Sequence, residues 1–182
     1  MSKAFKDWAI VCEALGTGKQ SIILRKRGLR ESRFCFKLGE FFLFPGHFHQ
    51  QLKKTRVPAG LAIPEATDGK VEIRYLARRD WSAVVLEWQR VAALQPHHIW
   101  TDAVIRERFD YDGELAINLA CVRVYRLEPV WRLDDLPVFG GCRSWIDLPP
   151  MPKGTCLQPV LSDEQHQEIS QTIRAIAKPT EA

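Results

Sequence analysis

Alternation of apolar and polar positions predicts more strand than helix in the first third of the chain. In "DWAIVCEAL" the residues Trp8, Ile10 and Cys12 fall on one face of an extended segment. The stretch "GTGK" is typical of a tight turn and "SIILRKR" of a returning strand, so residues 7–27 are predicted to form a hairpin. A further short strand, "EFFLF", is expected to stop at Pro45.

Two longer strand signals occupy the middle of the chain. The segment "VEIRYLA" alternates apolar with charged residues, and "ARRD" is expected to turn it into a second strand, "WSAVVLEWQRV". In "ELAINLACVRVYRL" apolar residues occupy both faces, with Leu119 and Cys121 on one and Val122 and Val124 on the other. Such a segment is typical of a central strand that is covered on both sides.

Helix signals are confined to two places. In "WTDAVIRERF" Thr101 is a candidate N-cap for a short helix, and Ser162 with Gln165 has the spacing of a capping box for a helix over about 162–177. That last helix carries a stripe of isoleucines. No strand-helix-strand pattern repeats, so the sequence predicts an α+β fold: a mixed, partly closed β-barrel with a short helix and a C-terminal helix.

The composition is that of an ordinary globular protein. The chain has 182 residues, of which 46% are hydrophobic and 26% charged, and this fits a single domain over residues 1–182. No apolar run has the length of a signal peptide or a membrane span, so we expect a soluble protein without a membrane partner. Five cysteines without a Cys-x-x-Cys pair fit reduced thiols in the cytoplasm better than a disulfide framework.

The formal net charge of +4 hides an uneven distribution. The first 60 residues contain twelve Lys and Arg against four Asp and Glu, which gives this part +8 and leaves −4 for the remainder. Basic residues cluster at the expected strand end, and a patch of this kind attracts phosphates in a salt-dependent manner. The cations expected to hold phosphates are Arg25, Lys26, Arg27 and Arg30. A solvated strand end explains the same charges without a ligand.

Three interpretations of His47 and His49 stay open. On an extended segment both rings point the same way, so they can reach one Zn²⁺ or Fe²⁺, with His97 or His98 as a third ligand. They can instead bond a phosphate or a base, or simply complete the loop. No carboxylate or thiolate stands at a ligand spacing, so no metal or other cofactor is predicted.

Two tryptophans are expected at the ends of elements. Trp100 precedes the capped helix, and Trp145 follows a Gly-Gly turn. Aromatic rings at loop mouths beside cations suit stacking on an unstacked base, which contributes about 1–3 kcal/mol per base. Rings that plug the ends of a barrel are the alternative.

Signatures of known enzyme classes are weak. Asp68 with Glu72 and Arg74 is the nearest match to a magnesium-dependent nuclease, but arginine replaces the lysine that orients water. The "GTGK" stretch lacks the spacing of a phosphate-binding loop, and no Gly-x-Ser-x-Gly elbow occurs. Cys142 is the best nucleophile candidate, but a structural turn with a bystander thiol is the favoured interpretation. The sequence therefore favours a protein that is not an enzyme.

Five ordered segments carry a family resemblance: "AFKDWAIVCEALGTGKQSIILRKRGLRE", "FFLFPGHFHQ", "HHIWTDAVIRERF", "VRVYRLEPV" and "FGGCRSWIDLP". From about residue 5 to residue 149 the chain resembles the domain-of-unknown-function family numbered 1802. The resemblance implies a part in restriction-modification, because members occur with Mrr-like restriction-endonuclease domains. Where relatives show Tyr or Thr after "FP", this chain has Gly46-His47. The order of elements is also similar to PUA-like and ASCH-type barrels, which implies a pocket for RNA or a flipped base.

The resulting hypothesis is a nucleic-acid-binding module, a sensor of a base or modified base with a restriction-type nuclease partner. Its expected binding residues are Arg25, Lys26, Arg27, Arg30, His47, His49, His98, Trp100 and Trp145. One alternative is a metal-dependent hydrolase or nuclease that uses His47, His49 and Glu72 as ligands. Another is a protein-interaction subunit that docks through the isoleucine stripe.

Overall fold

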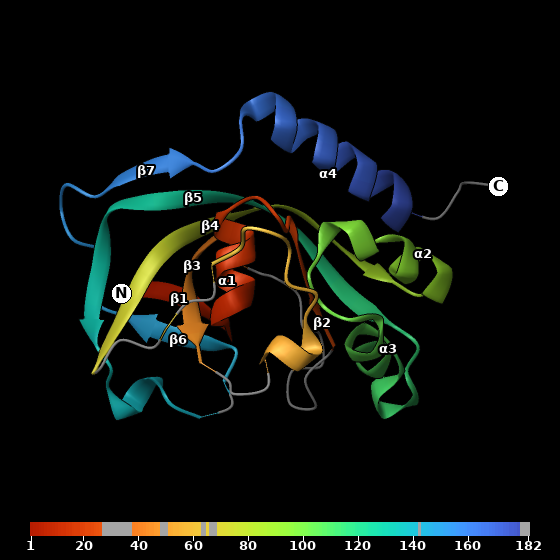
Figure 1. Cartoon of the computed structure of the whole chain (residues 1–182), viewed down its shortest axis with the longest axis horizontal. Coiled ribbons are helices and arrows are strands. Elements are labelled where there is room, and N and C mark those ends of the chain that lie inside the picture. Colours follow the sequence, from red (N-terminus) through yellow and green to blue (C-terminus); the bar gives the residue numbers. More distant parts are fainter. Residues whose placement is uncertain (27–37, 48–50, 63–64, 66–68, 142, 179–182) are drawn as a thin grey trace.

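A mixed seven-stranded sheet forms the framework of the protein in a computed structural model (Figure 1). The structure describes residues 1–26, 38–47, 51–62, 65, 69–141 and 143–178. The strand order is β2-β5-β4-β3-β1-β6, and β7 pairs with β5; only β1 and β3 run parallel among the described pairs. The strands are β1 (Ser2–Trp8), β2 (Ile22–Arg25), β3 (Glu40–Gly46), β4 (Lys70–Val85), β5 (Ile117–Asp134), β6 (Trp145–Leu148) and β7 (Cys156–Pro159).

Four α-helices accompany the sheet in the described part of the chain. They are α1 (Ala9–Gly16), α2 (Trp88–Ala93), α3 (Asp102–Asp110) and α4 (Asp163–Ala177). Short 3₁₀ turns occur at η1 (Gln51–Lys54), η2 (Gln95–His97), η3 (Tyr111–Gly113) and η4 (Pro137–Phe139). The sheet curves around α1, which contacts β1, β3, β4 and β5, while α4 lies on the outer side near β5 (Figure 1). The α+β fold with a mixed, partly closed sheet is therefore confirmed.

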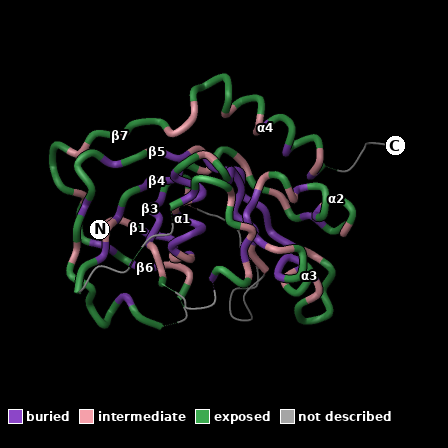
Figure 2. Tube along the Cα trace, in the orientation of Figure 1, coloured by how far each residue is buried: buried purple, intermediate pink, exposed green. Residues whose placement is uncertain are grey.

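The predicted hairpin over residues 7–27 is wrong. The segment from Ala9 to Gly16 is a helix, and β1 pairs with β3 and β6, whereas β2 pairs with β5. Every residue of α1 except Glu13 is buried, and Figure 2 shows it as a purple core of the molecule. A short apolar run that is buried on all sides has no periodicity that separates helix from strand.

The predicted turn at "ARRD" is also wrong, because β4 continues through it with an irregularity between Arg79 and Trp81. The polar residues there have partners on neighbouring elements. Arg78 pairs with Glu40, and Asp80 accepts a hydrogen bond of 2.5 Å from the Ser170 hydroxyl of α4. The residues "WSAVVLEWQRV", which were expected to form a second strand, instead form the end of β4 and the start of the helix α2.

The other long elements match their sequence signals. β5 is buried on both faces along its first half. α3 begins directly after Thr101, although the Thr101 side chain makes no capping hydrogen bond within the described residues. At the start of α4 the Ser162 hydroxyl accepts a hydrogen bond of 3.2 Å from the Gln165 amide, so the capping box is present. The isoleucine stripe of α4 faces the protein's own core, where Ile173 is fully buried. No helix in the described ranges combines the length and apolarity that a membrane crossing needs.

Candidate functional site: a cation cluster and an adjacent pocket

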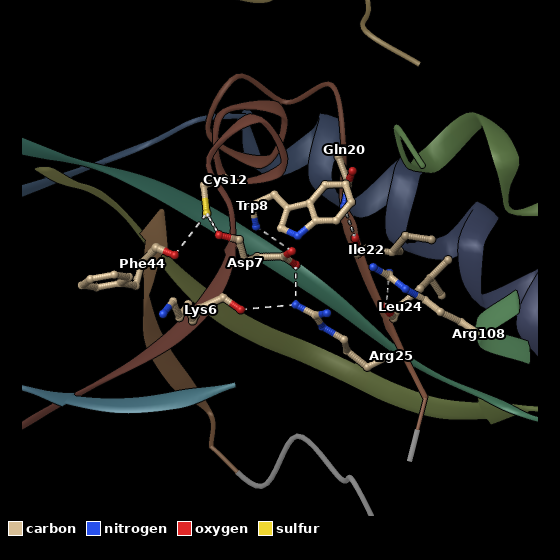
Figure 3. A network of polar contacts seen from close by, with 10 residues as sticks. All are labelled: Lys6, Asp7, Trp8, Cys12, Gln20, Ile22, Leu24, Arg25, Phe44 and Arg108. Atoms are coloured by element: carbon tan, nitrogen blue, oxygen red, sulfur yellow. Dashed lines mark hydrogen bonds and ion pairs between the residues drawn. The ribbon is translucent and has the colours of Figure 1, made fainter. Parts of the chain in front are cut away.

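The central feature of the site is an ion pair between the end of β2 and the end of β1. Arg25 Nη2 lies 3.1 Å from Asp7 Oδ2 and donates a hydrogen bond of 3.2 Å to the carbonyl of Lys6 (Figure 3). Asp7 is buried, and its other oxygen accepts a 2.8 Å hydrogen bond from the amide of Trp8. Since β2 and β1 are not paired as strands, this contact joins them through side chains.

A second guanidinium approaches the same place from α3. Arg108 Nη1 donates a hydrogen bond of 3.0 Å to the carbonyl of Leu24, and its Cζ lies 3.9 Å from the centre of the Trp100 ring. Burial, followed by repulsion from Arg25, lowers the pKa of Arg108 to about 10, so it remains charged at neutral pH. The ring of Trp8 meets that of Trp100 edge-on at 4.6 Å.

Lys26, which was expected to hold phosphate, is bonded within the protein. Its Nζ donates to the carbonyls of Phe109 (3.0 Å), Ala116 (3.3 Å) and Glu114. These carbonyls lie at the end of α3 and in the connection to β5, where an ammonium group is favourable. Lys26 thus anchors α3 to the end of β2.

The structure places His98 and Trp100 in the interior, with exposed fractions of 5% and 1%. Burial, then the nearby charges of Arg56 and Arg108, lowers the pKa of His98 to about 3, so the imidazole is neutral. Arg56 holds this segment by donating to the carbonyls of His98 and Trp100. Their contact with a ligand stays a prediction, because both rings are covered in this structure.

Trp145 is only partly buried and lies among other rings. It contacts Phe5 at 5.0 Å and Phe41 at 5.2 Å between ring centres. The Arg25 guanidinium in turn lies 4.9 Å from the centre of the Phe5 ring. Arg25 therefore contacts Phe5, which packs against Trp145. Arg25 also pairs with Asp7, whose carboxylate accepts from the amide of Trp8 beside Trp100. That these residues bind a nucleic acid together stays a prediction.

Three residues of the expected binding set, Arg27, Arg30 and His49, lie outside the described residues. The nucleophile candidate Cys142 and the nuclease candidate Asp68 lie outside them as well.

A pocket of about 570 Å³ lies on the other side of β1, between α1, β3, β4 and the segment around η4. Lys6 and Cys12 line this pocket and also contact the cation cluster. The carbonyl of Lys6 accepts a hydrogen bond from Arg25, and the Cys12 thiol lies 3.9 Å from the carbonyl of Asp7. The charged and polar lining comprises Lys6, Glu13, His47, Glu65, Lys70, Glu72, Arg74, Tyr75 and Asp135. Of the expected binding residues that the structure describes, His47 alone lines this pocket.

Two carboxylates of the pocket have fixed partners. Glu13 Oε2 accepts a 2.9 Å hydrogen bond from the Tyr75 hydroxyl, and burial, followed by the charge of Glu13, raises the pKa of Tyr75 far above its usual value. Glu72 accepts from Arg74 (2.6 Å) and from Arg132 (3.0 Å), and these hydrogen bonds lower its pKa. The pocket thus offers carboxylate acceptors and a phenol that stays protonated.

The described residues give little support to a reactive nucleophile or a metal centre at this site. The Cys12 thiol is buried, and burial, with the charge of Asp7, raises its pKa well above the ordinary value, which keeps it protonated. Among the described residues, no three His, Cys, Asp or Glu side chains gather closely enough to hold a metal ion. The alternative ligand set of His47, His49 and Glu72 has two members at the pocket, and the third lies beyond the described ranges.

Comparison with known proteins gives a family and a set of distant structural likenesses. No curated protein matches the chain. Crystal structures of ASCH from Zymomonas mobilis are similar to it, with 10% identity over 93% of this chain and 94% of that one and a TM-score of 0.45. A serine-to-alanine variant of the same protein has 11% identity, with 94% of this chain and 95% of that one covered and a TM-score of 0.46. A tyrosine-to-phenylalanine variant has 11% identity, with 93% of this chain and 96% of that one covered and a TM-score of 0.47. Residues 4–172 match the family described as "Domain of unknown function (DUF1802)", and the chain belongs to that family.

Proposed function

We propose that this protein is a nucleic-acid-binding module that receives one base in the pocket beside β1. The observation that carries the proposal is the pocket itself: about 570 Å³, a volume typical of ligand sites, with rings and hydrogen-bonding groups in its wall. Phe44, Tyr75 and Phe139 supply apolar surface, while Glu13 supplies an acceptor for the amino or imino groups of a base.

The phosphate backbone is the expected partner of the cations. Lys6, Lys70 and Arg74 line the pocket, and Arg25 bonds the carbonyl of Lys6 in β1. The first 60 residues carry the charge excess of +8, which supports long-range attraction of a polyanion. The finer proposal is a sensor of a base or modified base that works with a restriction-type nuclease in the cytoplasm. It is supported by the sequence resemblance and the cysteine usage.

A pocket-narrowing variant tests the proposal. Leu136 lines the pocket and is 49% exposed, so Leu136→Trp adds a ring at the pocket without disturbing the core. Val138, 60% exposed on the same turn and outside the pocket lining, gives the matched control Val138→Trp. We expect Leu136→Trp to weaken binding of fluorescent single-stranded DNA or RNA about tenfold and Val138→Trp to leave it unchanged. The proposal fails if neither nucleic acid binds at concentrations up to about 100 µM at low salt.

A metal-dependent hydrolase is the second candidate, because His47 and Glu72 line the same pocket. Its weakness is that both oxygens of Glu72 already accept from arginines. Metal analysis of protein purified without a histidine tag separates the candidates. Stoichiometric zinc or iron, lost in His47→Ala, would favour the hydrolase over the binding module.

A further inference from the structure

Two guanidinium groups lie near the junction of β2 and β1, and one of them pairs with a buried carboxylate. Arg25 and Arg108 come from different elements, β2 and α3, and both point toward Asp7 and the indole of Trp8 (Figure 3). Arg25 pairs with Asp7 at 3.1 Å, whereas Arg108 bonds the neutral carbonyl of Leu24. Within this cluster the charges sum to about +1, since two cations face one anion.

Both guanidiniums retain donors that the described protein does not use. Each guanidinium has five N–H donors, and the Nε–H of Arg25 is buried without a partner. For Arg108, the hydrogen bond to Leu24 is its one bond within the described residues. A ring covers one face of each group, Phe5 for Arg25 and Trp100 for Arg108. These rings hold the planes of both groups, while donors on their edges remain unpaired within the described residues.

An excess of buried positive charge is unfavourable unless an anion compensates it. The lowered pKa of Arg108 reflects this, because burial and the charge of Arg25 both disfavour its protonated form. A second anion between the two guanidiniums would remove the repulsion and use the free donors. Phosphate oxygens fit the forked geometry of arginine.

We propose that Arg25 and Arg108 form a phosphate subsite in which Asp7 is the resident counterion. The proposal rests on the proposed function, since it assigns the phosphate of a nucleic-acid ligand to a defined pair of residues. Asp7 competes with the phosphate for Arg25, so it weakens binding and keeps the unliganded cluster folded. Arg108 was not among the residues that the sequence indicated, because its neighbours Arg106 and Glu107 make it resemble an ordinary solvated helix position.

Opposite effects of two substitutions test the subsite. The probes are inorganic phosphate and a 5′-phosphorylated dinucleotide, and the unphosphorylated dinucleotide serves for comparison. Each is titrated into the protein by calorimetry, with chloride used to keep the ionic strength constant. Arg108→Gln removes one cation and should weaken both phosphate probes about tenfold, and Arg108→Lys should restore part of the loss. Asp7→Asn removes the competitor and should tighten both. Arg106→Gln is the matched control, because Arg106 lies on the same helix, is exposed, and pairs with Asp110.

The outcomes separate this subsite from structural damage and from the pocket. A structural defect would weaken binding in both Asp7→Asn and Arg108→Gln, so weaker binding by folded Asp7→Asn overturns the proposal. Equal phosphate binding by the wild-type protein and Arg108→Gln also overturns it, and this comparison does not depend on Asp7→Asn folding. If phosphate binding fails while Leu136→Trp still weakens oligonucleotide binding, the subsite is wrong and the pocket stands.

Discussion

Arg25 Nη2 lies 3.1 Å from Asp7 Oδ2, and this pair connects β2 with β1, two strands that the hydrogen-bonded sheet leaves apart. Arg25 also bonds the carbonyl of Lys6, so one side chain holds two groups of β1. The curved sheet is therefore completed at this point by a side chain and not by strand pairing. Arg25, which the sequence led us to expect at a phosphate, thus makes structural contacts with β1.

Replacing Arg25 by methionine should destabilise the protein strongly. The substitution leaves the Asp7 carboxylate, whose side chain is 2% exposed, without its cation, and breaking a buried pair in this way costs about 3 kcal/mol. Urea unfolding followed by circular dichroism measures the change. As a control, Arg78→Met removes an exposed pair with Glu40 and should cost less than about 1 kcal/mol. A loss at Arg25 no larger than at Arg78 would show that the Asp7 contact does not hold the strands together.

Lys26→Met separates a structural lysine from a phosphate-binding one. Because Lys26 Nζ donates to three carbonyls at the end of α3 and in the connection to β5, the variant should lose about 1–2 kcal/mol of unfolding free energy. The salt dependence of oligonucleotide binding should stay the same, since this ammonium group already has its partners. If the slope of log K against log[salt] fell by about one while stability stayed unchanged, Lys26 would be a phosphate-binding residue.

Long periodic segments and the capping box of α4 could be predicted from the sequence, whereas the use of individual polar residues could not. β5 and α4 carry their own local signals, namely apolar residues at both parities and a capping box. The segment from Ala9 to Gly16 carries no such signal, because a fully buried helix and a buried strand both appear as a continuous apolar run.

The site illustrates the same limit. The clustering of cations near Arg25 was visible in the sequence. The positions of Asp7 and Arg108 beside this cluster were not visible, because they depend on the strand order and on the packing of α3. Trp100 was expected at a loop mouth and does end a loop, yet the fold covers it with Arg108 and Trp8. Only His47 of the expected residues that the structure describes reaches the pocket, since the pocket combines segments that are far apart in the sequence.

Gly16→Ala should displace the ring of Tyr75, which forms part of the pocket wall. A Cβ atom at Gly16 would lie 2.0 Å from Cζ of Tyr75, a separation that real atoms do not adopt, so the ring must move. The hydrogen bond between the Tyr75 hydroxyl and Glu13 resists that movement, and we expect a loss of about 1–3 kcal/mol despite the better helix propensity of alanine. Gly39→Ala is the control, because its Cβ meets nothing within 4 Å. Equal thermal stability of the two variants would mean that the Tyr75 ring relaxes freely.

Acid should destabilise the protein partly through His98. Its pKa is lowered to about 3 in the folded protein by burial and by nearby arginines, whereas an exposed histidine titrates near 6.5. Between these values the unfolded chain binds a proton that the folded protein does not, so stability falls as the pH decreases from about 6.5 toward 3, by up to about 1.4 kcal/mol per pH unit. His98→Phe removes this titration, and urea unfolding at pH 7, 6, 5 and 4 should give a shallower decline. The remaining decline includes His97 and His166, whose pKa values burial also lowers. Parallel curves for the two proteins would show that His98 takes up its proton in the folded state as readily as in the unfolded one.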